Sequence, residues 1–248
     1  MIVLGFDTST SATAVAVRLS DGTVTQARDD PPAGAHPGHA TRLLDMASQL
    51  LSSAAVAWNQ LDRIAVGLGP GTFTGLRVGV ATARGLAQSL DIELVGVSSL
   101  QALAAAALSA KAETAVLAVI DARRGEAFAA AYERGDHGSV RELAPPRAVP
   151  PQELASVLAE ARRVSGSDQP RWLALGDGAV RFHSELQDAG IVTAPVDSVL
   201  HRVSAACICQ LGVRGPVMSL QQLVPDYRRR PDAELALEGV GTAKRVLT

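Results

Sequence analysis

A glycine-rich turn is the stretch of this sequence whose residue types and spacing come closest to a nucleotide-binding motif. It lies between an apolar run at residues 64–68 and a helical pattern that continues to Leu86. Backbone N–H groups at the start of such a helix, and glycines without Cβ, would let a phosphate approach closely. The spacing fits neither G-x-G-x-x-G nor G-x-x-x-x-G-K-[ST], since Thr72 replaces the last glycine of the first and no lysine follows. We interpret the turn in preference as a structural elbow, with a phosphate cradle as the alternative. Its residues are Gly67, Gly69, Pro70, Gly71 and Gly75.

Two aspartates stand where a metal-bound phosphate or a catalytic base could be held. Asp7 follows an apolar run at residues 2–6, and Asp121 follows a similar run at 115–120. An aspartate at the end of a strand is more often a turn former, whose oxygens accept bonds from the next N–H groups. The hairpin around Asp7 also lacks the lysine or arginine expected beside phosphate charge. We therefore favour a structural role for Asp7.

Other catalytic chemistries find little support in the residue types. His36 and His39 are the only close pair of histidines, and they flank Pro37-Gly38 in a loop instead of sharing a helix face. Cys207 and Cys209 are too close together for an easy disulfide, and two thiols cannot make a zinc site alone. No serine stands in a recognisable nucleophile motif. The expectation is a chain with no catalytic residues and no metal.

Composition indicates an ordinary globular chain. Its 248 residues are 47% apolar and 19% charged, with a formal net charge of −2 and a pI near 6.2. This balance gives no electrostatic reason for strong nucleic-acid binding over the surface. We expect no signal peptide and no membrane span, and a reducing cytoplasm suits the two cysteines.

The same order of elements occurs twice along the chain. Apolar and alternating runs predict strands at 2–6, 12–19, 23–27, 64–68 and 93–97, with helices at 39–57, 74–86 and 99–110. In the second half we predict strands at 115–120, 126–132 and 172–175 and helices at 152–163, 180–189 and 198–212; the proline-rich residues 144–151 are left unassigned. The repeat indicates an α/β fold of two similar lobes with a cleft between them. We place the lobes at residues 1–111 and 112–222, with a partly ordered tail at 223–248.

Two helices of the first lobe are the candidate docking surface. The apolar stripe of residues 39–51 is wide enough to cover a sheet and leave apolar surface for another chain. In the second helix, small residues recur every four positions at Gly75, Gly79, Ala83 and Ala87, which lets a neighbour come close. Arg77 and Arg84 would rim the contact. The candidate interface residues are Ala40, Leu43, Met46, Leu50, Leu76, Arg77, Val80 and Arg84.

Particular strings add a resemblance to known families. Two lobes that each open with strand, acidic turn and strand resemble the actin, Hsp70 and sugar-kinase superfamily, whose nucleotide lies between the lobes. FDTSTSATAVAV at 6–17, GLGPGTFTGLRVGVATARGLA at 67–87, VGVSSLQALA at 95–104 and IDARRGEAF at 120–128 are similar to segments of the bacterial TsaB family, also called YeaZ.

This resemblance implies a function without catalysis. Members of that family are non-catalytic partners of the enzyme TsaD, which with TsaE makes the N6-threonylcarbamoyl modification on adenosine 37 of tRNAs that read ANN codons. It implies docking through the helix pair to TsaD or, without it, to a second copy of the chain, and contact with tRNA only through the complex. A vestigial or weak binding site for ATP or ADP remains an alternative. Its residues would be Asp7, Thr8, Gly69, Gly71 and Asp121.

One departure from the relatives bears on catalysis. TsaD-like proteins carry metal-binding residues at the start of a helix, where this chain has Ser99 and Leu103, and leucine has no donor atom. Two alternative functions remain, an ATPase or small-molecule kinase of the same fold and a metallopeptidase of the glycoprotease type.

Overall fold

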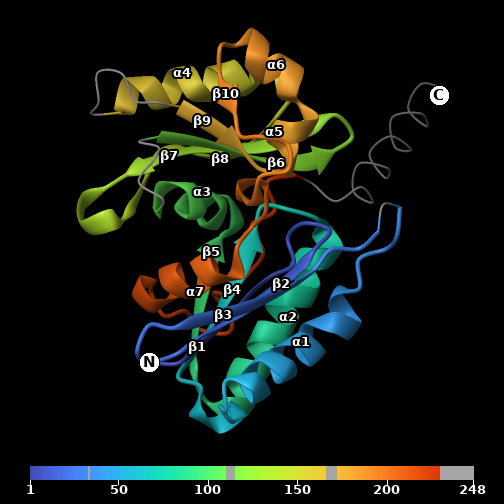
Figure 1. Cartoon of the computed structure of the whole chain (residues 1–248), viewed down its shortest axis with the longest axis vertical. Helices are drawn as coiled ribbons and strands as arrows, with labels where there is room; N and C mark the ends of the chain where they lie inside the picture. Colours follow the sequence, from blue (N-terminus) through green and yellow to red (C-terminus); the bar gives the residue numbers. More distant parts are fainter. Residues whose placement is uncertain (33, 110–114, 166–171, 230–248) are drawn as a thin grey trace, which may run out of the picture.

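The first lobe is built on a five-stranded mixed sheet (Figure 1). The computed structural model describes residues 1–32, 34–109, 115–165 and 172–229. Strand β1 pairs antiparallel with β2 and parallel with β4, so the chain leaves β1 through a hairpin and returns through a helical crossover. The strand order is β3-β2-β1-β4-β5, with β1 at Val3–Asp7, β2 at Thr13–Arg18, β3 at Val24–Asp29, β4 at Arg63–Gly69 and β5 at Glu93–Ser98.

The second lobe repeats this sheet strand for strand. Its central strand β6 pairs antiparallel with β7 and parallel with β9, as β1 does with β2 and β4. The two sheets confirm the expected α/β architecture of two similar lobes. The order is β10-β9-β6-β7-β8, with β6 at Ala115–Arg123, β7 at Glu126–Arg134, β8 at Val140–Val149, β9 at Trp172–Leu175 and β10 at Val192–Thr193.

Helices cover both faces of both sheets (Figure 1). One layer, α1 and α2, covers the outer face of the first sheet, and α4 to α6 cover the outer face of the second. Between the sheets lie α3 and α7. Bounds are α1 His39–Ser53, α2 Phe73–Leu90, α3 Ser99–Ser109, α4 Leu154–Val164, α5 Asp177–Arg181, α6 His183–Asp188 and α7 Ala205–Arg214, with 3-10 turns at Trp58–Gln60, Asp136–Gly138, Pro151–Glu153 and Val199–His201.

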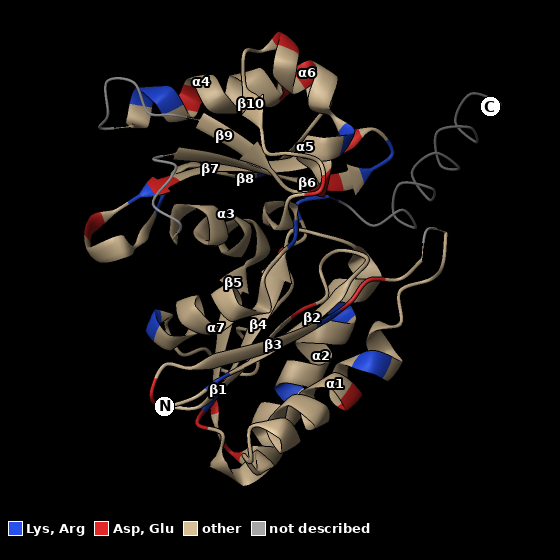
Figure 2. Ribbon diagram, viewed as in Figure 1, with Lys and Arg blue, Asp and Glu red and all other residues tan. Residues whose placement is uncertain are grey.

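The central layer joins the two lobes through one apolar core. Alternate residues of β1 and β6, such as Val3 and Val116, pack with α3 and α7 in a single buried cluster. Figure 2 shows α3 without a charged residue, as expected for a helix between two sheets. The central strands of both sheets, such as β1, β6 and β7, are therefore buried on both faces, which explains their nearly continuous apolar sequences.

Helix α7 packs on the first sheet although it follows the second sheet in the chain. A Cβ on Gly5 would lie 2.5 Å from Cys209 Sγ, and a Cβ on Gly212 would lie 2.4 Å from Ala65 Cβ. Both glycines are therefore needed for helix and sheet to approach. Residues 205–214 fall within the range 112–222 expected for the second lobe, but their packing partners are β1, β2 and β4 of the first.

Several elements differ from the sequence-based expectation. The helix expected at 180–189 is two short helices, α5 and α6, the helix expected at 198–212 begins only at Ala205, and β10 was not predicted. The unassigned residues 144–151 belong largely to β8, an edge strand that tolerates Pro145 and Pro146 because its register is irregular there and its outer side needs no partner. Helix α1 ends at Ser53 instead of Ala57, since Ala55 takes a left-handed φ of 53°.

The described part of the C-terminal tail returns to the first lobe. Leu223 is fully buried in the core under α1 and α2, and the Asp226 N–H donates to Leu68 O at 2.8 Å. Residues 230–248 of the expected tail, including Arg230, lie outside the described residues.

Candidate functional site

Asp7 is the centre of a buried hydrogen-bond network at the end of β1. Its side chain is 1% exposed. Oδ1 accepts from the Ser9 N–H at 2.9 Å and the Ser9 hydroxyl at 2.7 Å, and Oδ2 accepts from the Ser99 hydroxyl at 2.6 Å. Ser99 begins α3, and its hydroxyl accepts in turn from the Gly69 N–H at 3.2 Å. The network therefore ties together three segments that are distant in the sequence, and both oxygens of the Asp7 carboxylate are occupied.

The glycine-rich turn closes over this network. A Cβ on Gly67 would lie 1.9 Å from Asp7 Oδ2, and one on Gly71 would lie 2.2 Å from Ser9 O. Thr8 then binds α2 directly, because its hydroxyl donates to Gly75 O at 2.7 Å. The backbone after β1 fills the space beside these glycines, which supports the structural-elbow interpretation of the turn over the phosphate cradle.

Asp121 occupies the corresponding place in the second lobe, with different partners. Its Oδ2 accepts from Arg181 Nη1 at 2.7 Å, and its N–H donates to Asp177 Oδ1 at 3.0 Å. Burial raises the pKa of Asp177, and the nearby carboxylate of Asp121 acts in the same direction. Asp177 is not among the site residues predicted from the sequence, although the repeat places it at the helix start that follows β9, where the first lobe has its glycine-rich turn.

A cavity of about 280 Å³ opens between the lobes, but the expected cleft residues do not line it. Its wall includes Thr10 and Ser11 from the first lobe and Asp177 and His201 from the second. Asp7, Thr8, Gly69 and Gly71 instead belong to the buried network, while Asp121 pairs with Arg181 in the other lobe. These five residues do not line this cavity, and their part in a nucleotide cleft stays a prediction.

His39 connects α1 to the same region. Its Nδ1 lies 2.9 Å from the Thr13 hydroxyl, and no hydrogen-bond partner of Nε2 is found among the described residues. Burial of the imidazole lowers the pKa of His39, while the carboxylates of Asp7 and Asp29 act in the opposite direction. His39 is therefore a core side chain in this arrangement.

The lowered pKa predicts a loss of stability in mild acid. The pKa of histidine in an unfolded chain is about 6.5. As the pH falls through this value, the unfolded chain therefore binds more protons than the folded one. The melting temperature should therefore fall more between about pH 7.5 and about pH 5.5 in the wild type than in His39→Asn. His183→Asn, at an exposed position on α6, is the control and should follow the wild type. Parallel curves for wild type and His39→Asn would contradict the assignment.

Ser99 and Leu103, which the resemblance compares with metal-binding positions, are used for packing. Ser99 donates to Asp7, and Leu103 is fully buried in the central core. Within the described ranges, no group of three or more histidine, cysteine, aspartate or glutamate side chains is placed to hold a metal ion.

Burial divides the expected interface residues into two groups. Leu43, Met46, Leu76 and Val80 are each at most 5% exposed and pack in the core of the first lobe. Their side chains therefore cannot form an outer docking surface, which corrects the expectation for these four. Ala40, Arg77 and Arg84 are exposed and Leu50 is half-buried. Leu44, which the sequence analysis did not select, is 46% exposed.

The C-terminal tail already contacts one of these exposed residues. Arg77 Nε donates to the Tyr227 hydroxyl at 3.1 Å, and the Arg77 guanidinium lies 3.8 Å from the centre of the Phe73 ring. The rings of Phe73 and Tyr227 are 4.9 Å apart. Arg77 is therefore held along the flank of α2.

The repeated sheets, each with an acidic turn packed by a glycine-bearing segment, define a two-lobed α/β protein of the actin, Hsp70 and sugar-kinase type. A family model described as TsaD, tRNA N6-adenosine threonylcarbamoyltransferase, matches residues 30–162. The Escherichia coli protein named tRNA threonylcarbamoyladenosine biosynthesis protein TsaB is 30% identical over 96% of this chain and 99% of its own length. The chain belongs to the TsaB family.

Solved structures agree with this assignment. The structure of YeaZ from Pseudomonas aeruginosa superposes with a TM-score of 0.72 at 30% identity, over 91% of this chain and 99% of that one. A ROK hexokinase from Thermus thermophilus superposes with a TM-score of 0.51 at 15% identity, over 86% of this chain and all of that one, a likeness of fold alone. Among the helices described, none is both long and apolar enough to cross a membrane.

Proposed function

We propose that this chain is a non-catalytic subunit that docks onto a TsaD-type enzyme, with TsaE, for N6-threonylcarbamoylation of adenosine 37 in ANN-decoding tRNAs. The observation that carries the proposal is the state of Asp7, the residue that a kinase of this fold would use. Its carboxylate is buried, accepts three internal hydrogen bonds, and is covered by the glycine-rich turn. These contacts support a structural role for the Asp7 carboxylate. We therefore look for the function in contacts that the outer surface makes with another protein.

The outer surface of α1 and α2 is the proposed docking site. Leu44 is the large apolar side chain of α1 that is exposed there. On α2, exposed or half-buried positions at i, i+4, i+7 and i+11 carry small or uncharged residues, which let another helix approach closely. This strip consists of Thr74, Val78, Ala81 and Gly85. In the absence of the enzyme, the same surface would pair two copies of the chain.

Reconstitution tests the proposal. The chain should co-purify with the TsaD protein of its own organism, and modification of an ANN-decoding tRNA by TsaD and TsaE should fall at least about tenfold when the chain is left out. The lone chain should neither hydrolyse ATP nor modify tRNA. Equal modification with and without the chain would refute the proposal. ATP turnover by the lone chain would support instead an ATPase or kinase that uses the cavity between the lobes.

A further inference from the structure

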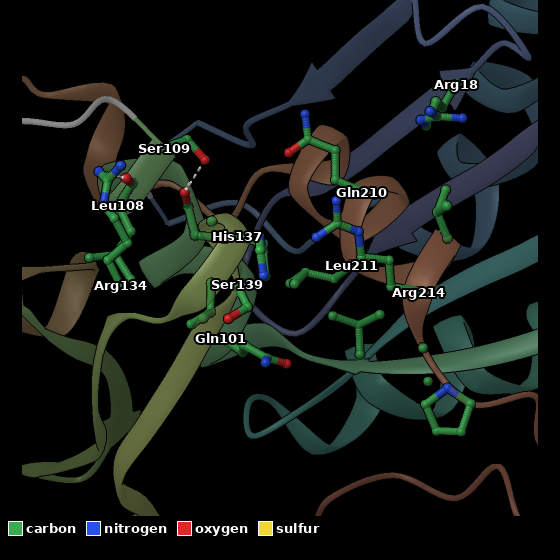
Figure 3. A pocket seen from close by; sticks show the side chains of 18 residues that line it. Arg18, Gln101, Leu108, Ser109, Arg134, His137, Ser139, Gln210, Leu211 and Arg214 are labelled. Carbon is green, nitrogen blue, oxygen red and sulfur yellow. Dashed lines mark hydrogen bonds between the residues drawn. The ribbon is translucent and has the colours of Figure 1, made fainter. Parts of the chain in front are cut away.

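A second, larger pocket lies away from Asp7, where both lobes meet the central helices. Its volume is about 540 Å³, within the range of small-molecule sites. The end of α7 forms one side, and the end of α3 with the turn between β7 and β8 forms the other (Figure 3). Gly96 and Val97 of β5 also line the pocket. A molecule bound here would therefore contact both lobes.

The pocket wall is strongly basic. Arg18, Arg134 and Arg214 line it together with His137, and no aspartate or glutamate is among the described residues that do so. In Figure 3 Arg134 lies at one end and Arg18 at the other, while Arg214 extends between them toward the side where His137 lies. Three guanidinium groups without a carboxylate among the lining residues favour an anionic ligand.

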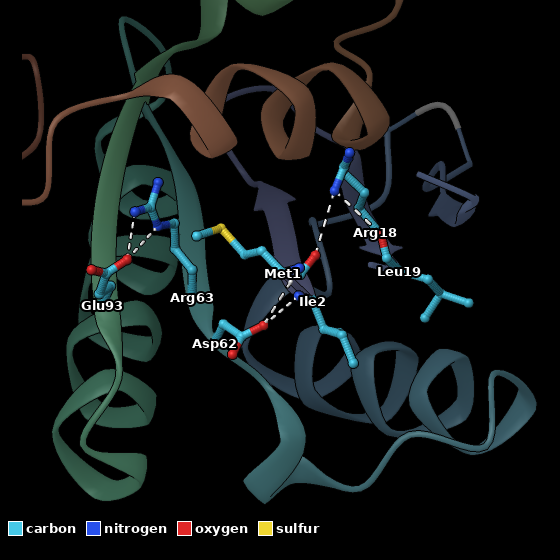
Figure 4. A network of polar contacts seen from close by, with 7 residues as sticks. All are labelled: Met1, Ile2, Arg18, Leu19, Asp62, Arg63 and Glu93. Atoms are coloured by element: carbon cyan, nitrogen blue, oxygen red, sulfur yellow. Dashed lines mark hydrogen bonds and ion pairs between the residues drawn. The ribbon is translucent and has the colours of Figure 1, made fainter. Parts of the chain in front are cut away.

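Capping of helix ends does not account for Arg214. The C-terminal carbonyls of α7 already accept hydrogen bonds from a charged side chain of β4. Arg63 Nη1 donates to Gly212 O at 2.7 Å and to Val213 O at 3.0 Å. Arg63 is held in place by Glu93 (Figure 4). Within the described part of the chain no side-chain hydrogen bond or ion pair of Arg214 is found, so its exposed guanidinium is available to a ligand.

The other two arginines keep their charge although they have partners. Arg134 donates to Leu108 O at the end of α3, and Arg18 donates to Leu19 O at 3.2 Å. These carbonyls are neutral, so they orient the guanidinium groups without cancelling the charge, although the Asp21 carboxylate, outside the pocket wall, also attracts Arg18. The rest of the wall is mixed: Val97 and Leu211 are apolar, while Gln101 and Gln210 carry amides.

We propose that this pocket binds a small organic molecule that carries phosphate groups. The guanidinium groups contact the phosphate oxygens, and the apolar and amide side chains contact the body of the molecule. Because the wall comes from both lobes, binding fixes one lobe against the other and raises the stability of the whole chain. This site is separate from Asp7 and from the docking surface of α1 and α2.

Calorimetric titration of the full chain tests the site with three probes: ADP, inorganic pyrophosphate and adenosine. We expect ADP or pyrophosphate to bind, and adenosine to bind more weakly by about tenfold or more. In the variant Arg214→Gln, the affinity for the phosphate-bearing probe should fall about tenfold or more. The matched control is Arg163→Gln, which removes an exposed arginine from the last turn of α4 in the same way. It should bind like the wild type.

A second pocket variant separates a loss of binding from a loss of folding. His137 takes a left-handed φ of 54°, a conformation that glycine adopts freely, so His137→Gly removes the ring without straining the turn. This variant should keep the wild-type melting temperature and bind the phosphate-bearing probe more weakly than the wild type. The proposal is overturned if neither phosphate-bearing probe binds at millimolar concentration, if adenosine binds equally well, if Arg163→Gln weakens binding as much as Arg214→Gln, or if neither pocket variant changes binding.

Discussion

Gly75→Ala should lower the melting temperature by roughly 5–15 °C, although alanine is the better helix former. The added Cβ would lie 2.0 Å from the backbone oxygen of Thr8 and 2.6 Å from the Thr72 hydroxyl. Backbone cannot move away cheaply here, because Asp7 and Ser9 hold it by hydrogen bonds. We expect a destabilisation of roughly 2–4 kcal/mol, at the upper end of overpacking effects.

The same helix offers a matched control. Gly85 lies on α2 with no heavy atom within 4 Å of an added Cβ. Gly85→Ala should therefore stabilise the chain by about 0.5–1 kcal/mol, the gain in helix propensity. Thermal unfolding followed by circular dichroism measures both variants. If Gly75→Ala were as stable as Gly85→Ala, the close packing of α2 on the end of β1 would be wrong.

Leu44→Glu should abolish co-purification with TsaD, with at least a hundredfold loss of affinity, and leave the fold intact. Leu44 is exposed, so the carboxylate costs little in the free chain, but it would be buried without a partner in the proposed complex. Pull-down and the tRNA modification assay should both lose their signal. Val80→Glu is unsuitable for this test because Val80 is 4% exposed and its replacement would disrupt the core.

An equally exposed apolar residue in the other lobe provides the control. Val164, at the end of α4, is 49% exposed, and Val164→Glu should bind TsaD as the wild type does. Equal melting temperatures of the two variants would show that binding, and not folding, has changed. Full co-purification of Leu44→Glu would place the docking surface elsewhere.

The sequence predicted the first sheet and three strands of the second, because both central strands are apolar runs that end in an aspartate. It did not predict β8, which contains two prolines, or β10, which has two residues. It could not decide which leucine of α1 faces inward. Leu43 and Leu44 are adjacent and equally apolar, so the register of α1 on the sheet, with Leu43 buried and Leu44 exposed, follows only from packing. The bond between Asp7 and Ser99 joins residues far apart in the chain, and no local pattern signals it.

The position of α7 also bears on the order in which the chain can fold during synthesis. The N-terminal strands leave the ribosome first, but their inner face is covered by a helix that ends at Arg214. Until that helix emerges, Val3, Ala16 and Ala65 have no permanent cover on that side. The core of the first lobe is therefore completed only after α7 has been synthesised. A nascent chain stopped before residue 205 would expose an apolar sheet face that chaperones could bind.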